Sequence, residues 1–269
     1  MEQEVLLSSI VLYCHYLRLP EHLPRSGSRE LYELCRQRFK EKFTIGRDKF
    51  YDVLRANGLM LRRRRYRPHT TNSRHLCHIY PDLLNTHPKL VAEKNGMLMV
   101  GDITYVCCKE GFAYLSLLTD AYSRYIVGYH LYPSLDAEGP LLALKKALDF
   151  YHSNKVDLSR LIHHSDRGVQ YASKDYVKML KDNNIQISMT QDGDPLHNAL
   201  TERMNNTLKN GWLFNEGTLS FKEAQESIKE AIWMYNTARP HQSLHMKVPM
   251  EVMTGRYDNP LLNQAGCSL

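Results

Sequence analysis

Three acidic residues stand out because a carboxylate is unusual in the places where the sequence puts them. Asp102 interrupts the apolar run M-V-G-D-I-T-Y-V, where an unpaired buried charge is costly. Asp166 follows a second apolar run, in H-H-S-D-R-G-V-Q-Y, and Glu202 lies in N-A-L-T-E-R-M-N-N-T-L-K. Residues 167 through 201, 35 in number, separate the last two acids. We predict that the three side chains meet in space and act together.

A cluster of three carboxylates predicts a divalent-metal site. At about 4 Å each pair of carboxylates repels by roughly 1–4 kcal/mol, and hard cations reverse that sign. Two Mg²⁺ (or Mn²⁺) ions in such a cluster can activate the attacking oxygen and stabilise the leaving oxygen of a phosphoryl transfer. The sequence has no G-x-x-x-x-G-K-[ST] and no G-x-S-x-G motif. Asp102, Asp166 and Glu202 are therefore the predicted catalytic and metal-binding residues.

Each acid taken alone has a simpler explanation, as a turn residue, a salt-bridge partner or a solvated helix residue. His163 and His164 could also be metal ligands, although core or surface roles are commoner for histidines in such positions. Asp120, in L-L-T-D-A-Y-S-R, is expected to end a strand and pair with Ser123 or Arg124. Only the order and context of the three acids together favour a shared site.

The elements that must position these acids follow from the spacing of apolar residues. Short β-branched or aromatic runs predict strands over 97–107, 112–118, 125–131, 161–163 and 185–188. Helical spacing predicts helices over 137–152, 173–181, 195–212 and 220–235, the last one starting with a capping box of Ser220 and Glu223. The expected fold class is α/β, with a mixed five-stranded sheet flanked by helices over residues 97–257 and a C-terminal tail over 258–269.

The predicted helix over 195–212 has one polar and one apolar side. At about 100° per residue, Glu202 shares its side with Asn198, Asn206 and Lys209, opposite a stripe of Leu and Met that includes Leu208. The helix can therefore pack with one face and present an acid, two amides and a lysine with the other. Asn206 and Lys209 are candidate DNA contacts on that face.

The N-terminal region carries the basic excess of the chain. Residues 1–75 hold 16 Lys+Arg against 8 Asp+Glu, while the whole chain has 35 against 29. Helices are expected over 3–18, from an N-cap at Ser28 to about residue 43, and from Arg47 to Asn57, with Gly58 ending the last one. Helix, glycine-containing turn and helix together outline a helix-turn-helix, or else an ordinary helical hairpin with a solvated face.

Two groups of residues in this region are candidates for DNA binding. Arg47, Lys49 and Tyr51 lie on the second helix of the expected helix-turn-helix. Arg62, Arg63, Arg64 and Arg65 are consecutive, and an extended arm carrying them could follow a phosphate backbone. The alternative for this arm is a solvated charge run. The predicted organisation is a DNA-binding region over 1–69, a linker over 70–96 and the α/β core.

Composition places the chain in a broad class. With 43% hydrophobic and 24% charged residues among 269, it can bury a core. Its six cysteines form no C-x-x-C pattern, which favours free thiols in a reducing compartment. No segment reaches the ~20 apolar residues that a membrane-spanning helix needs. The expected location is the cytosol.

Five stretches resemble a known family: V-G-D-I-T-Y-V, L-L-T-D-A-Y-S-R-Y-I-V-G, H-H-S-D-R-G-V-Q-Y, N-A-L-T-E-R-M-N-N-T-L-K and Y-N-T-A-R-P-H-Q-S-L. They are similar to the integrase core of bacterial insertion-sequence transposases, in particular the second-frame (OrfB) products of the "IS-three" group. The resemblance implies an RNase H-like fold with Asp102, Asp166 and Glu202 as the metal-binding catalytic triad. It also implies that Lys209 contacts the DNA of the element end, and that residues 28–60 form a helix-turn-helix.

The function implied by the resemblance is divalent-metal-dependent DNA cleavage and strand transfer of an insertion sequence. The partners implied are the terminal inverted repeats of the element, the target DNA, further copies of the chain on DNA, and an upstream-frame (OrfA) product. Two alternatives stay open from the residues. One is a catalytically silent, transposase-derived DNA-binding protein, and the other is a nuclease that cuts without joining.

Overall fold

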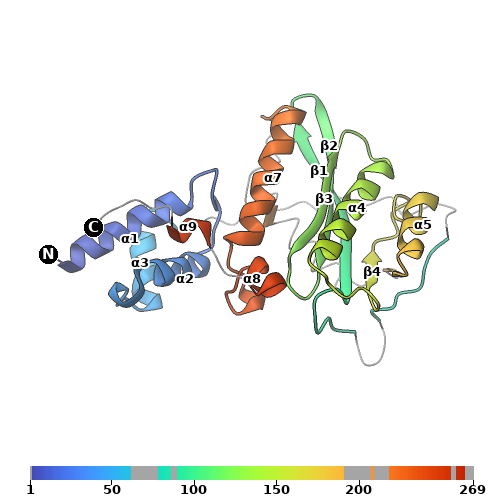
Figure 1. Cartoon of the computed structure of the whole chain (residues 1–269). Coiled ribbons are helices and arrows are strands. Elements are labelled where there is room, and N and C mark those ends of the chain that lie inside the picture. Colours follow the sequence, from blue (N-terminus) through green and yellow to red (C-terminus); the bar gives the residue numbers. More distant parts are fainter. Residues whose placement is uncertain are drawn as a thin grey trace. The chain divides into compact units, whose positions relative to one another are not determined.

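The computed structural model describes residues 2–61, 78–85, 90–190, 207–208, 218–255 and 259–263. The chain divides into two compact units (Figure 1). One unit contains the β-sheet, and the other combines the N-terminal helices with the chain from Ile228 onward. The helical unit is therefore built from both ends of the sequence.

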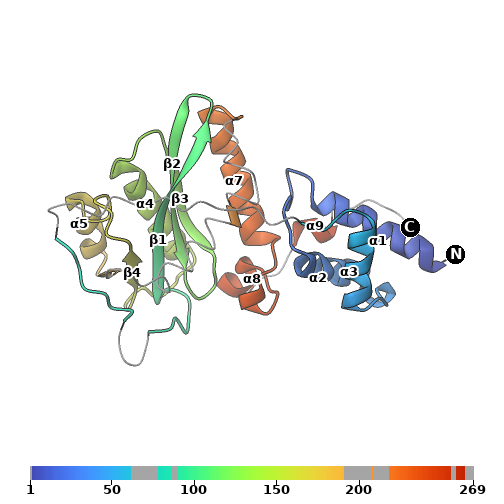
Figure 2. The ribbon, with the colours of Figure 1, turned by 180° about the vertical axis from the view of Figure 1, so that it is seen from behind.

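A mixed five-stranded sheet forms the centre of the first unit, with the strand order β3-β2-β1-β4-β5. Strands β1 (Leu98–Cys108), β2 (Gly111–Asp120) and β3 (Ile126–Tyr132) form an antiparallel meander. Strands β4 (Ile162–Ser165) and β5 (Gln186–Met189) run parallel to β1. This order and these directions confirm the RNase H-like α/β class that the sequence predicts, and Figure 2 shows the sheet from behind.

Helices connect the strands and cover the sheet. Helix α4 (Glu138–Ser153) packs against β3, and α5 (Lys174–Asp182) links β4 to β5. The α4 contact depends on a glycine in β3, since a Cβ added at Gly128 would lie 2.2 Å from the carbonyl oxygen of Ala143. The five predicted strands and the helices predicted over 137–152 and 173–181 agree with the structure to within a few residues, and the helix predicted over 195–212 lies outside the described residues except for 207–208.

The end of β2 is organised around one buried carboxylate. Asp120 accepts hydrogen bonds from the backbone N–H groups of Gly96 (2.9 Å), Tyr122 (3.1 Å) and Ser123 (2.9 Å). It also accepts hydrogen bonds from the hydroxyls of Ser123 (2.8 Å) and Tyr151 (3.0 Å). The pairing with Ser123 confirms the sequence prediction. The links to Gly96 and Tyr151 tie the linker and α4 to the strand, and they were not foreseen.

Three helices form the N-terminal part of the second unit: α1 (Glu2–Leu17), α2 (Ser28–Phe39) and α3 (Arg47–Ala56). Gly58 has φ 67°, which confirms its place just after α3, where only glycine adopts the left-handed conformation without strain. The predicted N-cap of α2 was wrong by one residue. Gly27 is the N-cap, and its backbone N–H donates to the carboxylate of Glu30 at 3.1 Å.

The C-terminal end of the chain completes the core of this unit. Helix α7 (Phe221–Thr237) begins with the predicted capping box, in which the Ser220 backbone N–H donates to Glu223 at 2.7 Å. Buried residues from this end, Met234, Ala238 and Leu261, join the cluster formed by α1, α2 and α3. Met234 lies in α7, Ala238 directly follows that helix, and Leu261 lies in α9 (Pro260–Asn263). Between these two helices the chain also forms η2 (Gln242–Leu244) and α8 (Pro249–Thr254).

Polar contacts between the two ends of the chain hold this core together. The guanidinium of Arg239 donates to Glu30 at 3.0 Å, and both side chains are largely buried. The hydroxyl of Tyr13 donates to the carbonyl of Leu261 at 3.2 Å. In α1 and α2 the thiols of Cys14 and Cys35 are free and lie 3.7 Å apart, in line with the predicted reduced cysteines. No helix within the described residues is long and apolar enough to cross a membrane.

Candidate active site

The parallel pairing of β1 with β4 brings two of the three predicted acids together. In this pairing Val100 lies opposite His164. Asp102 follows Val100 by two positions within β1, and Asp166 follows His164 by two positions, in the turn just after β4. Neighbouring strands lie about 4.8 Å apart in a sheet, so the pairing brings the segments that carry the two acids side by side. Both side chains are half-buried.

The loop that carries Asp166 is held by hydrogen bonds on both sides. The backbone N–H of Gly168 donates to Asp166 Oδ1 at 2.9 Å, which closes a tight turn over the carboxylate. The Arg167 side chain donates through Nε to the carbonyl of Thr190 at 2.7 Å, just after β5. The turn that carries Asp166 is therefore tied to the chain just after β5, and the Gly168 backbone holds the carboxylate.

A tyrosine that the site prediction missed lies beside both acids. A Cβ added at Gly101 would lie 3.3 Å from Cε1 of Tyr171, and one added at Gly168 would lie 3.7 Å from its Cδ2. The ring thus packs against the backbone next to Asp102 and next to Asp166. Burial raises the pKa of Tyr171 well above its ordinary value, and the charges of Tyr176, Asp102 and Asp166 raise it further. The only sequence signal is the final Y of H-H-S-D-R-G-V-Q-Y.

The donor set fits a divalent cation. Two carboxylates side by side repel each other unless a cation lies between or beside them, and oxygen ligands are those that Mg²⁺ and Mn²⁺ prefer. Glycines at Gly101 and Gly168 leave no Cβ beside the acids. Among the described residues, no group of three or more His, Cys, Asp or Glu side chains could hold a metal ion, and Glu202 is not among those residues.

The two histidines next to Asp166 have core roles, the commoner of the two expected. His163 is fully buried, and its Nε2 lies 2.9 Å from the hydroxyl of Tyr176. His164 is also buried, and its Nδ1 lies 2.8 Å from the hydroxyl of Ser188 on β5. Burial, together with the smaller effect of the neighbouring His164, lowers the pKa of His163 to about 3. His163 is therefore neutral at physiological pH.

We expect His163 to make the free energy of unfolding depend on pH. Its pKa is lower in the folded chain than the ordinary value of about 6.5, so below pH 6.5 the unfolded chain binds more protons. The stabilisation is complete above about pH 6.5 and is lost toward pH 3, by at most about 1.4 kcal/mol per pH unit.

Denaturant unfolding of the wild type and of His163→Phe, measured between pH 7 and pH 4, tests this expectation. The variant should be about 1 kcal/mol less stable at pH 7, because the hydroxyl of Tyr176 loses its partner. The difference should shrink as the pH falls, since phenylalanine does not titrate. Stability curves that stay parallel over the whole range would show that His163 does not carry this pH dependence.

The remaining predicted site residues of the core lie outside the described residues. They are Glu202, Asn206 and Lys209. Thr207 and Leu208, which lie between Asn206 and Lys209 in the sequence, are helical. Leu208 is buried, as expected for the apolar side of that helix. Arg62, Arg63, Arg64 and Arg65 of the basic arm also lie outside the described residues.

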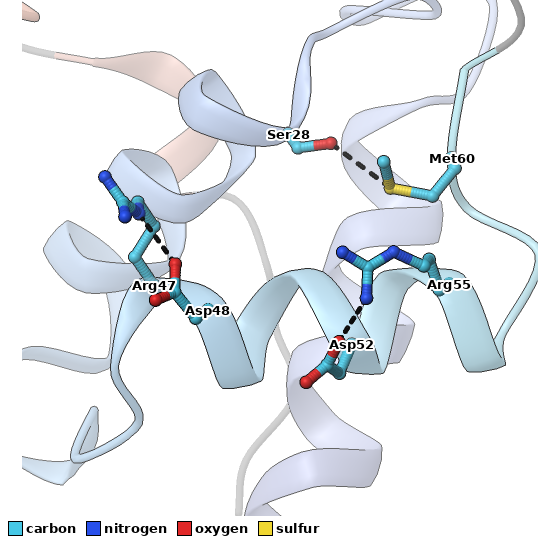
Figure 3. A network of polar contacts seen from close by, with 6 residues as sticks. All are labelled: Ser28, Arg47, Asp48, Asp52, Arg55 and Met60. Atoms are coloured by element: carbon cyan, nitrogen blue, oxygen red, sulfur yellow. Dashed lines mark hydrogen bonds and ion pairs between the residues drawn. The ribbon is translucent and has the colours of Figure 1, made fainter.

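In the helical unit, the predicted DNA contacts of α3 divide into two kinds. Arg47 and Lys49 are exposed, and Nε of Arg47 donates to Asp48 at 3.0 Å (Figure 3). A second pair further along the helix joins Arg55 to Asp52. Tyr51 is half-buried against the core of the unit, so its ring is less available than those two side chains.

Models of the integrase core domain match residues 92–195 and residues 183–249 of the chain. The segment with the sheet and both described acids thus defines a protein of the integrase-core class, a group of polynucleotidyl transferases that act on DNA with divalent metal ions. Among solved structures, the HTLV-2 integrase catalytic core domain in complex with magnesium is 17% identical. It covers 61% of this chain and 99% of that one, with a TM-score of 0.47.

Relatives among curated proteins come from bacterial insertion elements. The 31 kDa protein of insertion element IS600 from Shigella sonnei is 31% identical over 205 residues, covering 74% of this chain and 72% of the relative. The transposase for IS904 from Lactococcus lactis subsp. lactis is 31% identical over 200 residues, covering 74% and 77%. The transposase for IS629 from Shigella sonnei is 30% identical over 169 residues, covering 63% and 55%. The chain belongs to the family of insertion-sequence transposases with an integrase core.

Proposed function

We propose that this transposase cuts DNA at the ends of its insertion sequence and joins the freed ends to target DNA, using Asp102, Asp166 and Glu202. The observation that supports the proposal is the parallel pairing of β1 with β4, which brings the strand with Asp102 beside the strand that ends just before Asp166. Glu202 would complete the set from the helix that follows the sheet. The three carboxylates would hold two Mg²⁺ (or Mn²⁺) ions.

The reaction consists of two phosphoryl transfers. Water attacks a phosphodiester at the element end, the bond from phosphorus to the 3′ oxygen breaks, and a 3′-OH is released. That hydroxyl then attacks a phosphodiester of the target, the target's bond from phosphorus to its 3′ oxygen breaks, and a target 3′-OH leaves. The DNA is thus joined without a covalent protein–DNA intermediate. When bound, the metal ions would supply positive charge to the attacking and leaving oxygens. The carboxylates of the chain fix where that charge lies, since their strands cannot move independently.

DNA binding is assigned to basic and polar side chains in both parts of the chain. Asn206 and Lys209 share the predicted helix face of Glu202 and would contact the element end. Arg47 and Lys49 on α3, with Tyr51 in a supporting place, and the arm of Arg62, Arg63, Arg64 and Arg65 would bind phosphates. Each lysine or arginine contact to phosphate adds to the salt dependence of binding.

The organisation we propose assigns DNA binding mainly to the region over 1–69 and chemistry to the core over 97–257. The segment 70–96 would link them, and 258–269 would form the tail. Two element ends must be held at once for joining, so the working form would be a homo-oligomer on DNA. An upstream-frame (OrfA) product would be a further partner, and the site of action would be the bacterial nucleoid.

The test uses the full chain and labelled duplexes that carry the inverted repeats flanking its coding region. In Mg²⁺ the wild type should give both nicked and joined products, and Glu202→Gln should give neither while still binding the duplex. Wild-type binding without any cleavage would favour the catalytically silent DNA-binding protein. Cleavage without joined products would favour the nuclease.

A further inference from the structure

The hydroxyl of Tyr171 is a buried polar group whose surroundings point to the acid pair. The side chain is only 2% exposed, and its hydroxyl has no hydrogen-bond partner among the described residues. A buried hydroxyl without a partner is rare in a folded protein and calls for an explanation. Its ring packs against the backbone at Gly101 and Gly168, next to Asp102 and Asp166 of the proposed site.

Tyr176 provides a direct comparison. The rings of Tyr171 and Tyr176 lie edge to face with centroids 5.4 Å apart, and both side chains are fully buried. The hydroxyl of Tyr176 has a partner, since it lies 2.9 Å from Nε2 of His163. Packing alone would be served equally well by phenylalanine at position 171. Packing does not explain why residue 171 carries a hydroxyl, so a function for that hydroxyl has to be found elsewhere.

The backbone around Tyr171 is built to let the ring approach the acids. Gly101 precedes Asp102 on β1, and a side chain there would come within 3.3 Å of the ring and within 3.0 Å of His163 Nε2. Gly168 follows Asp166, and a Cβ there would lie 2.9 Å from the carboxylate oxygen Oδ1. The ring, both glycines and both acids thus form one close-packed group.

Resting on the proposed function, we infer that Tyr171 is a positioning residue for the metal site, whose hydroxyl donates to the carboxylate pair of Asp102 and Asp166 when that pair holds a divalent cation. A carboxylate that binds a metal ion keeps lone pairs for further donors, and such donors orient the ligands of metal sites. A tyrosine hydroxyl is protonated at physiological pH and can act as a donor.

The experiment measures Mn²⁺ binding to the full chain by electron paramagnetic resonance of the free ion, which does not depend on catalysis. Tyr171→Phe should weaken binding by about tenfold to a hundredfold, the range typical of lost partners of metal ligands. Tyr176→Phe, the matched control, should bind Mn²⁺ as the wild type does. The Mg²⁺ concentration for half-maximal cleavage should rise in Tyr171→Phe and not in Tyr176→Phe.

Thermal unfolding separates a positioning role from a packing role. Without metal, Tyr171→Phe should unfold at the wild-type temperature or slightly above it, because it removes a hydroxyl that has no partner. Tyr176→Phe should unfold at a lower temperature, since it breaks the bond to His163. A Tyr171→Phe chain that is destabilised without metal, or that binds Mn²⁺ like the wild type, overturns the inference.

Mn²⁺ binding to Asp102→Asn distinguishes a failure of this inference from a failure of the proposed function. If Asp102→Asn binds Mn²⁺ as tightly as the wild type, the proposed metal site itself is wrong. If Asp102→Asn loses binding and Tyr171→Phe keeps it, the site stands and only the role of Tyr171 is wrong.

Discussion

Asp102→Asn lowers Mg²⁺-dependent cleavage of element-end DNA by at least about a thousandfold, the scale on which removing one preorganised charge-stabilising group acts. Asp166→Asn is expected to have the same effect, because the parallel strands set both carboxylates at one position of the sheet. Asparagine keeps the size of the side chain and one oxygen but loses the charge that attracts a divalent cation. Single-turnover cleavage, measured at saturating DNA, reports the loss.

The same substitutions should leave the metal-free chain at least as stable as the wild type. Two half-buried carboxylates on neighbouring strands repel by on the order of 1 kcal/mol when no cation lies near, and the amide removes that repulsion. Thermal unfolding in a chelator and duplex binding by gel shift are the controls. Wild-type cleavage rates in either variant would contradict the assignment, and so would loss of folding as the sole cause of inactivity.

Asp120→Ala should destabilise the sheet unit by more than about 3 kcal/mol, since it strips several buried donors of their acceptor at once. The lost contacts are those to the backbone of Gly96, Tyr122 and Ser123 and to the hydroxyls of Ser123 and Tyr151. Burial and the charge of Asp120 hold the pKa of Tyr151 well above its ordinary value, so that hydroxyl remains a donor. Equilibrium unfolding in urea measures the change.

Two further variants show whether the network is the cause. Asp120→Asn should lie between Ala and the wild type, because its amide group would face the N–H of Gly96, which needs an acceptor. Asp149→Ala, at an exposed position of α4, should change the free energy of unfolding by less than about 0.5 kcal/mol. If Asp120→Ala is no more destabilising than Asp149→Ala, the network does not hold β2 and α4 together.

Local chemistry explains why most elements could be predicted from the sequence. Apolar periodicity and turn residues are short-range signals, so the strands around Asp102 and the helix α4 were found within a few residues of their ends. The same holds for Gly58 after α3 and for the capping box of Ser220. The N-cap of α2 was missed by one residue because Gly27 and Ser28 are both acceptable there, and the contact from Glu30 decides between them.

The acid pair was predicted and the tyrosine beside it was not, for a physical reason. Asp102 and Asp166 can be recognised in the sequence because a charge beside an apolar run is unfavourable unless it has a function. Tyr171 reveals nothing in the sequence, since a tyrosine near a strand is most often a packing residue. The role of Tyr171 depends on where its hydroxyl lies in the folded chain and on which groups surround it there.

By itself, the sequence determined the order of the elements, the α/β class and the acids on which the proposed chemistry depends, because those follow from residue type and short spacing. Only the tertiary structure decided which distant groups meet. It paired β1 with β4 in parallel, which brought the segments that carry Asp102 and Asp166 side by side. It also gathered the C-terminal end into the core of the N-terminal unit, where Arg239 contacts Glu30 across 209 positions of sequence. Such contacts depend on which faces pack together in the whole fold, and no local pattern encodes them.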